Sequence, residues 1–144
     1  MIQDSIAEIQ TFFERYREAF SNQDLEAFTA CFSEPFSLSS ATYLVEFASI
    51  ENVRKNLAAL LERYQLYGVQ QATIKSLQTR EYSSGHAIVD LTWQMEDRAG
   101  QTLLCFDTTY ILKRLEGHWK ITFVIAHNEH QRFQEITDIP HLEA

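Results

Sequence analysis

The first half of the chain has apolar residues at helical spacing. Near the start they recur every three or four positions, which places them on one face of a helix (Ile2, Ile6, Ile9, Phe13, Tyr16 and Phe20). Asp24 can cap a short second helix, which Pro35 limits to about residue 33. Ser49 can cap a third helix, and Gly68 stands where a glycine commonly follows a helix end. The sequence therefore predicts three helices before residue 69.

After Gly68 the pattern becomes that of long strands. Four segments are rich in Thr, Val, Ile and aromatic residues (69–80, 86–96, 102–114 and 118–128), and glycine-containing turns separate them. Two shorter strands fit between Phe36 and Phe47. Helices followed by a long meander predict an α+β fold, with the helices on the concave side of a curved, mostly antiparallel sheet. Such long strands must curl, and the concave mouth would be a natural ligand pocket.

Composition narrows the class of protein and of partner. The 144 residues fit one domain over 1–130, followed by a polar tail at 131–144. A net charge of −8 with scattered basic residues argues against nucleic acid or an anionic membrane as a partner. Cys31 and Cys105 lie in apolar segments and are expected to be reduced, buried thiols. We find neither a membrane-spanning run nor a secretion signal, so we expect a cytoplasmic protein.

Asp107 is the most unusual residue of the predicted strands. Alternation places it on one face with Cys105 and Thr109, and the opposite face contains Phe106 and Tyr110. Both faces are largely apolar, so we expect a buried carboxylate that is paired, hydrogen-bonded or protonated. A polar functional site and a purely structural bond to a neighbouring tyrosine are both open interpretations.

Three further residues are candidates for a site. Tyr16 lies on the apolar stripe of the first helix, and its buried hydroxyl would need a partner such as Asp107. His127 ends the last strand, and by alternation it shares a face with Trp119 and Ile121; it is either a base at the pocket rim or a core or interface histidine. Trp93 is expected in the core, or second to that in a pocket wall.

The order of these elements resembles the nuclear transport factor 2-like superfamily, which includes ketosteroid isomerases, scytalone dehydratases and SnoaL-type cyclases. The resemblance covers roughly residues 5–130, and its local marks are segments of the first helix, the third helix and the last strand (Arg15-Tyr16-x-x-Ala19, Ser49–Leu57 and Gly117-His118-Trp119). It implies a cone-shaped antiparallel sheet wrapped around N-terminal helices, the cystatin-like α+β roll. It also implies a homodimer that uses the sheet face without helices.

The ketosteroid isomerases suggest roles for particular residues. By resemblance, Tyr16 and a protonated Asp107 would donate hydrogen bonds to a ligand oxygen. The general base of those enzymes would fall near Ser40, where this chain has no carboxylate, so steroid isomerisation by the usual mechanism is not expected. No motif for a cofactor or a metal is present, and we expect neither.

Two functional hypotheses remain. In the first, the chain binds an apolar small molecule with a carbonyl or carboxylate in a closed pocket, and acts on it as a cofactor-independent isomerase, cyclase or dehydratase. In the second, it is a non-catalytic ligand-binding or dimerisation module in which Tyr16 and Asp107 satisfy each other.

Overall fold

The computed structural model describes residues 2–128, and the predicted tail at 131–144 lies outside them. The helices are α1 (Ile2–Ser21), α2 (Leu25–Thr29) and α3 (Ile50–Leu66). Both predicted caps are confirmed: the Asp24 side chain accepts a hydrogen bond from Ala27 N at 3.2 Å, and the Ser49 side chain accepts one from Asn52 N at 3.3 Å. Gly68 follows α3 with φ of +85°, which a residue with a side chain rarely adopts.

The strands form one curved, unclosed sheet. Its order is β2-β1-β6-β5-β4-β3, and every neighbouring pair is antiparallel except β1 and β6. The strands are β1 (Phe32–Ser39), β2 (Leu44–Phe47), β3 (Gln71–Ser83), β4 (His86–Glu96), β5 (Thr102–Leu115) and β6 (His118–Ala126). The predicted α+β fold with a curved, mostly antiparallel sheet is therefore confirmed.

The predicted end of the second helix is wrong. The second helix ends at Thr29 rather than near residue 33, and β1 begins at Phe32, with Pro35 inside the strand. Phe32 pairs with Ile121 of β6, so sheet pairing takes over where the sequence suggested further helix. Pro35 is tolerated because it lies in the irregular stretch between Phe32 and Ser37, where the register of β1 against β6 shifts.

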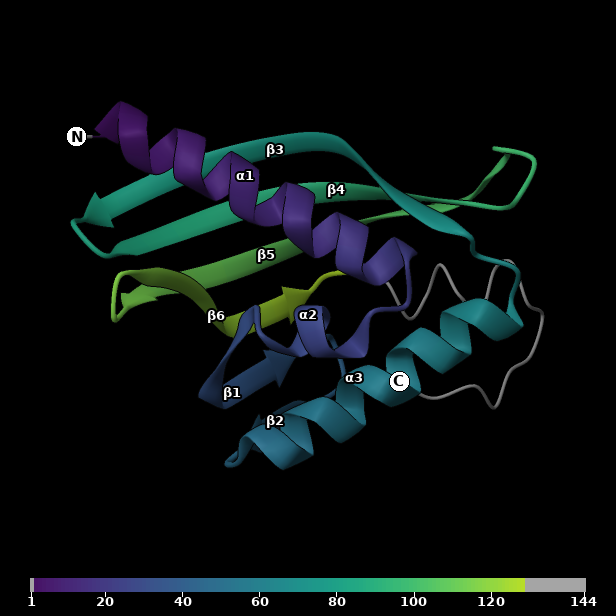
Figure 1. The fold of residues 1–144 in the computed structure, drawn as a ribbon, viewed down its shortest axis with the longest axis horizontal. Helices are drawn as coiled ribbons and strands as arrows, with labels where there is room; N and C mark the ends of the chain where they lie inside the picture. The colour runs from purple at the N-terminus through teal and green to yellow at the C-terminus, as the bar shows by residue number, and fades with distance from the viewer. Residues whose placement is uncertain (1, 129–144) are drawn as a thin grey trace.

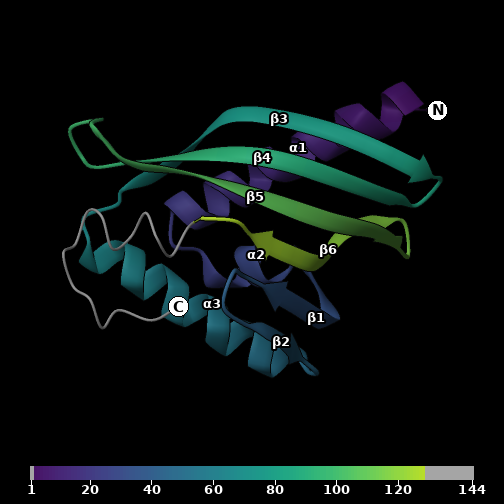
Figure 2. The same ribbon diagram turned by 180° about the vertical axis from the view of Figure 1, so that it is seen from behind.

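The helices lie on one face of the sheet, and the core fills the space between them. Figure 1 shows α1 crossing β3 to β5, with α2 and α3 beside β1 and β2. Seen from behind, the strands lie in front of the helices, so no helix of the described chain covers the outer face (Figure 2). The core is rich in aromatic rings, which pack mostly edge to face. Within residues 2–128, no helix is long and apolar enough to cross a membrane.

Candidate functional site

A cavity of about 250 Å³ opens between α3, the turn after β1 and the concave face of the sheet. Its buried lining consists mainly of aromatic and aliphatic side chains, with Tyr16, Phe36, Trp93, Met95, Phe106 and Tyr110 among them. The less buried lining residues form its rim, and most are polar (Ser40, Thr42, Asn56, Arg63, His127 and Asn128). An apolar interior with a few polar groups at the edge is typical of a small-molecule site.

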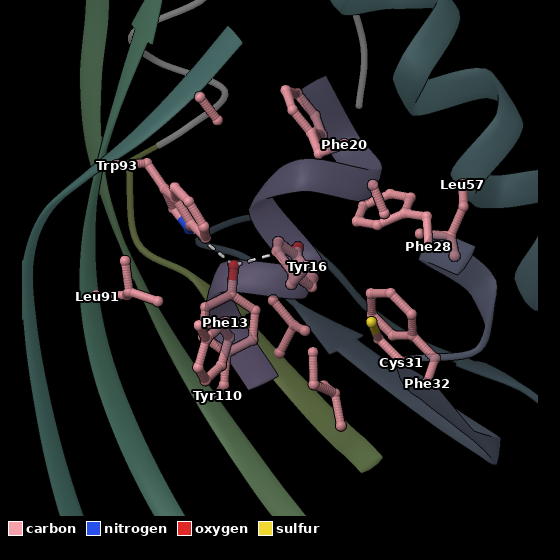
Figure 3. Close-up of a cluster of buried hydrophobic side chains, with 14 of the residues drawn as sticks. Phe13, Tyr16, Phe20, Phe28, Cys31, Phe32, Leu57, Leu91, Trp93 and Tyr110 are labelled. Carbon is pink, nitrogen blue, oxygen red and sulfur yellow. Dashed lines mark hydrogen bonds between the residues drawn. The ribbon is translucent and has the colours of Figure 1, made fainter. Parts of the chain in front are cut away.

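Hydrogen bonds join three aromatic side chains at the inner end of this cavity. The Trp93 indole Nε1–H donates to the Tyr110 hydroxyl at 2.8 Å, and that hydroxyl donates to the Tyr16 hydroxyl at 3.3 Å. Figure 3 shows both bonds between side chains from β4, β5 and α1. Tyr16 and Trp93 also stack, with ring centroids 5.5 Å apart. These hydrogen bonds hold the indole nitrogen and the two hydroxyl groups in fixed positions beside an otherwise apolar part of the cavity.

The prediction that Asp107 points inward and bonds to Tyr16 is wrong. Asp107 is exposed on the outer face of β5, where it accepts a hydrogen bond from Thr92 Oγ1 at 2.7 Å. The alternation along the strand was correct, but the face shared with Cys105 and Thr109 is the one that no helix covers. The expected hydroxyl partner of Tyr16 exists, and it is Tyr110.

The prediction that His127 shares a face with Trp119 and Ile121 is also wrong. In the pairing of β6 with β5, Ile121 lies opposite Leu112 and Phe123 opposite Ile111, so Thr122 is an extra residue in β6. Such a bulge shifts the alternation by one position. His127 is therefore directed to the outer face at the strand end, although it still contributes to the cavity rim.

Hydrogen bonds on that outer face determine which ring nitrogen of His127 carries the hydrogen. Thr109 Oγ1 donates to Asp90 Oδ1 at 2.7 Å and also lies 2.8 Å from His127 Nε2. The single hydroxyl proton of Thr109 is used toward Asp90, so His127 Nε2 must be the donor in its bond to Thr109. In the neutral ring, Nδ1 is then the acceptor, on a side chain that contributes to the cavity rim. Asp90 also pairs with Arg80 at 3.1 Å, which supports its role as acceptor.

Of the other predicted residues, Trp93 and Ser40 both line the cavity. Trp93 belongs to the core as well, with 2% of its surface exposed. Ser40 lies in the turn after β1, where its Oγ accepts a hydrogen bond from Thr42 N at 3.2 Å. The structure thus brings Tyr16, Ser40, Trp93 and His127 to one cavity and leaves Asp107 outside it.

Among the lining residues that were not identified from the sequence, three with polar groups are Tyr110, Asn56 and Arg63. From the sequence, Tyr110 was treated only as an apolar residue. Thr108 and Tyr110 are two residues apart on the same strand face, and both have a hydroxyl group, which could have indicated a polar group there. Asn56 and Arg63 lie seven residues apart on α3, at the edge of its apolar stripe, and both line the cavity. Polar residues seven apart recur on one helix face, which is the signal that could have identified them.

The cysteines are both free, and they differ in burial. Cys31 is buried, as predicted, whereas Cys105 is only half-buried, on the outer face. Burial raises the pKa of the Cys31 thiol to about 11, and the charge of Lys120 opposes this shift without overcoming it. Neither cysteine lines the cavity, so neither is a nucleophile for a ligand bound there.

Several solved structures share this fold. An NTF2-like protein of unknown function from Shewanella oneidensis is 18% identical, with a TM-score of 0.68 over 88% of this chain and 99% of that one. A proposed dehydratase from the NTF2-like family of Streptomyces avermitilis is 11% identical, with a TM-score of 0.66 over 88% of this chain and 97% of the other. A protein from Catenulispora acidiphila, solved in complex with S-DNPA, is 16% identical, with a TM-score of 0.68 over 87% and 93%.

These similarities establish the fold, and they are too distant to transfer an activity. No functionally curated protein matches the chain in sequence. A family model does match it, from the second turn of α1 to the end of the described residues. Over residues 7–129 the chain belongs to the NTF2-like protein family DUF6841.

Proposed function

We propose that this protein binds a small, largely apolar molecule in the cavity between α3 and the sheet. The observation that supports the proposal is the cavity itself, about 250 Å³ lined mainly by aromatic and aliphatic side chains. An apolar cavity of about 150 Å³ accommodates one benzene molecule, so this one has room for a body of about two fused rings. The S-DNPA complex of the Catenulispora acidiphila protein, which has the same fold, is consistent with this function.

A neutral two-ring probe tests the proposal. With about 13 non-hydrogen atoms, 2-naphthamide should bind with a dissociation constant in the micromolar to submillimolar range. Isothermal titration calorimetry measures this directly. Leu60→Trp should fill the cavity and weaken binding about tenfold or more, because Leu60 contributes to its lining. Leu66→Trp is the matched control, since Leu66 is on the same helix, 75% exposed and outside the lining.

Two results would contradict the proposal. The first is failure of wild-type protein to bind the probe at millimolar concentration. The second is equal binding by the Leu60→Trp and Leu66→Trp variants, since the probe would then lie elsewhere. Far-UV circular dichroism of both variants establishes that a loss of binding is not a loss of the fold.

Proton transfer at the cavity rim is a second candidate function, supported by the orientation of His127. With Nε2–H donating to Thr109, neutral Nδ1 can accept a proton from a carbon next to a ligand carbonyl. The Tyr16 hydroxyl, which accepts a hydrogen bond from Tyr110 and belongs to the cavity lining, would stabilise the enolate oxygen. Among the described lining residues there is no carboxylate, so the aspartate base of the ketosteroid isomerases has no counterpart here.

Deuterium exchange separates this activity from simple binding. The methyl ketone 2-acetonaphthone should exchange its α-protons in D2O faster with wild-type protein than in buffer, as measured by NMR. His127→Gln should abolish the acceleration, and Thr109→Val should reduce it by releasing the ring. Binding without accelerated exchange would favour a non-catalytic binding module.

The outer face of the sheet supports a homodimer. It presents half-buried apolar side chains between polar ones, and charges of both signs lie on it (Asp90, Asp107, Arg80 and Lys113), so a second copy would meet no uniform repulsion. Sedimentation should show a dimer at micromolar concentration. Ile111→Lys, which changes an apolar residue of this face, should give monomer, whereas Leu44→Lys on the edge strand β2 should leave the dimer intact. A wild-type monomer would contradict this assembly.

A further inference from the structure

The charge of the cavity lining differs from that of the whole protein. The chain has 20 Asp and Glu residues and a net charge of −8. None of the described residues that line the cavity is acidic, whereas one is an arginine, Arg63, and one is a histidine, His127. An acidic protein whose cavity excludes carboxylates and retains a cation is arranged to accept a negatively charged ligand group.

Arg63 lacks the ion pair that most other arginines of the described chain have. Arg17, Arg54, Arg80 and Arg114 each contact a carboxylate. Arg63 is half-buried, and within residues 2–128 it makes no ion pair or hydrogen bond. A partly desolvated guanidinium without a partner is unfavourable, and a ligand anion would supply the missing partner.

The sequence of α3 prevents Arg63 from pairing within its own helix. Residues three or four positions away are the ones that a helical side chain can reach. For Arg63 these are Ala59, Leu60, Leu66 and Tyr67, and none is acidic. Arg63 lies in the last turn of α3, where a positive charge can also interact favourably with the helix dipole. That interaction alone would not require Arg63 to line the cavity.

Asn56 adds a second polar group on the same helix face. It lies seven residues before Arg63, nearly two turns away, with Leu60 between them, and all three line the cavity. Asn56 is half-buried, and its amide makes no hydrogen bond within the described residues. The rim along α3 therefore offers a cation at one end and an amide at the other, above an apolar interior.

We infer that the ligand is an amphipathic organic anion, with an apolar body of about two rings inside the cavity and one carboxylate bound by Arg63. This inference rests on the proposed binding function and specifies its ligand class. Arg63 is the group suited to the carboxylate because its planar fork can donate two parallel hydrogen bonds to both oxygens. The Asn56 amide would bind a second polar substituent of the ligand, so it contributes to specificity rather than to the charge preference.

A matched set of probes tests the charge preference by titration calorimetry. The anion 2-naphthoate and the neutral 2-naphthamide have the same size and shape. Wild-type protein should bind the anion about tenfold or more tightly than the amide at low salt, and higher salt should reduce the ratio. In Arg63→Met the ratio should fall to about one, because the anion loses more affinity than the amide.

Two further variants make the test specific. Arg54→Met removes the same charge from the opposite face of α3, outside the cavity lining, and should keep the wild-type ratio. Arg63→Glu should instead favour the cationic probe 2-naphthylmethylamine over both other probes. Arg63→Lys retains the charge without the fork and should keep only part of the preference, which gives an informative variant should Arg63→Met fail to fold.

The outcomes separate this inference from the proposed function. The wild-type protein could bind the amide and the anion with similar affinity, while Leu60→Trp weakens the binding of both. This result would overturn the inference and leave the proposed binding function standing. A ratio that persists in Arg63→Met would also overturn it, since another group would bind the carboxylate. Failure of every probe to bind, or binding that Leu60→Trp leaves unchanged, would overturn the proposed function itself.

Discussion

Replacing Tyr110 with Phe should destabilise the protein through a side chain that the substitution does not touch. Within residues 2–128 the Tyr110 hydroxyl is the hydrogen-bond acceptor of the Trp93 indole N–H, at 2.8 Å, and each of the two residues is 2% exposed. Removing it leaves a buried donor unsatisfied, which costs about 1–3 kcal/mol. Tyr16→Phe should cost less, about 0.5–1.5 kcal/mol, because its bond to Tyr110 is longer, at 3.3 Å.

A double-mutant cycle assigns the cost to the stranded indole. Urea denaturation followed by far-UV circular dichroism gives the free energy of unfolding, and the slope against urea should stay constant. In the Trp93→Phe background there is no indole N–H to leave unsatisfied. Tyr110→Phe should therefore lower the free energy of unfolding by at least about 1 kcal/mol less in that background than in the wild-type background. In thermal melts, each kcal/mol should lower the midpoint by about 3–5 °C for a chain of this length.

A stability of Tyr110→Phe within about 0.3 kcal/mol of wild type in the Trp93 background would contradict a stranded indole, given the usual precision of such comparisons. An equal cost in both backgrounds would also contradict it, because the loss would then come from the tyrosine alone.

Three smaller perturbations test other parts of the structure. Gly68→Ala should lower stability by about 1 kcal/mol although its Cβ would meet nothing within 4 Å, because φ is +85° there; an unchanged urea midpoint would contradict this. Asp107→Asn should change stability by less than about 0.5 kcal/mol, since the amide can still accept from Thr92 at the surface, and a larger loss would indicate a buried carboxylate. With a pKa of about 11, Cys31 has a thiolate fraction of about 10⁻³ near pH 8, so mass spectrometry should show that iodoacetamide labels Cys105 first, and equal labelling of both cysteines in the native protein would contradict the burial of Cys31. The raised pKa also means that the free energy of unfolding falls as the pH rises from 9 toward 11.

Local signals in the sequence predicted the elements because local interactions determine them. Asp24 and Ser49 cap helices with their own side chains, and Gly68 has a backbone angle that few other residues tolerate. The strand boundaries of β4 agree with the sequence prediction at both ends, since glycine-containing turns limit it. By contrast, the end of α2 depends on the pairing of Phe32 with Ile121, almost ninety residues away, and no local pattern indicates it.

The site was harder to predict because it depends on which face of a strand lies inside. Alternation correctly separated Asp107 from Tyr110, but both faces of β5 are largely apolar, so the sequence did not identify the covered one. His127 shows a second limit, because one extra residue, Thr122, reverses the alternation between Ile121 and Phe123. Only the register against β5 reveals the reversal.

Together these features restrict the chemistry that the cavity can support. Two carboxylates in the middle of β4 and β5, Asp90 and Asp107, lie on the outer face, whereas the hydroxyls of Tyr16 and Tyr110 lie inside. Among the described lining residues, His127 has the only imidazole, and Asp90 is linked to it through Thr109. Because His127 and Arg63 both line the cavity, a ligand held by its carboxylate at Arg63 would have one orientation relative to His127, with its apolar body among the aromatic rings. Catalysis and charge selection would then depend on one orientation of the ligand, so Arg63→Met should slow exchange of an anionic ketone more than that of 2-acetonaphthone.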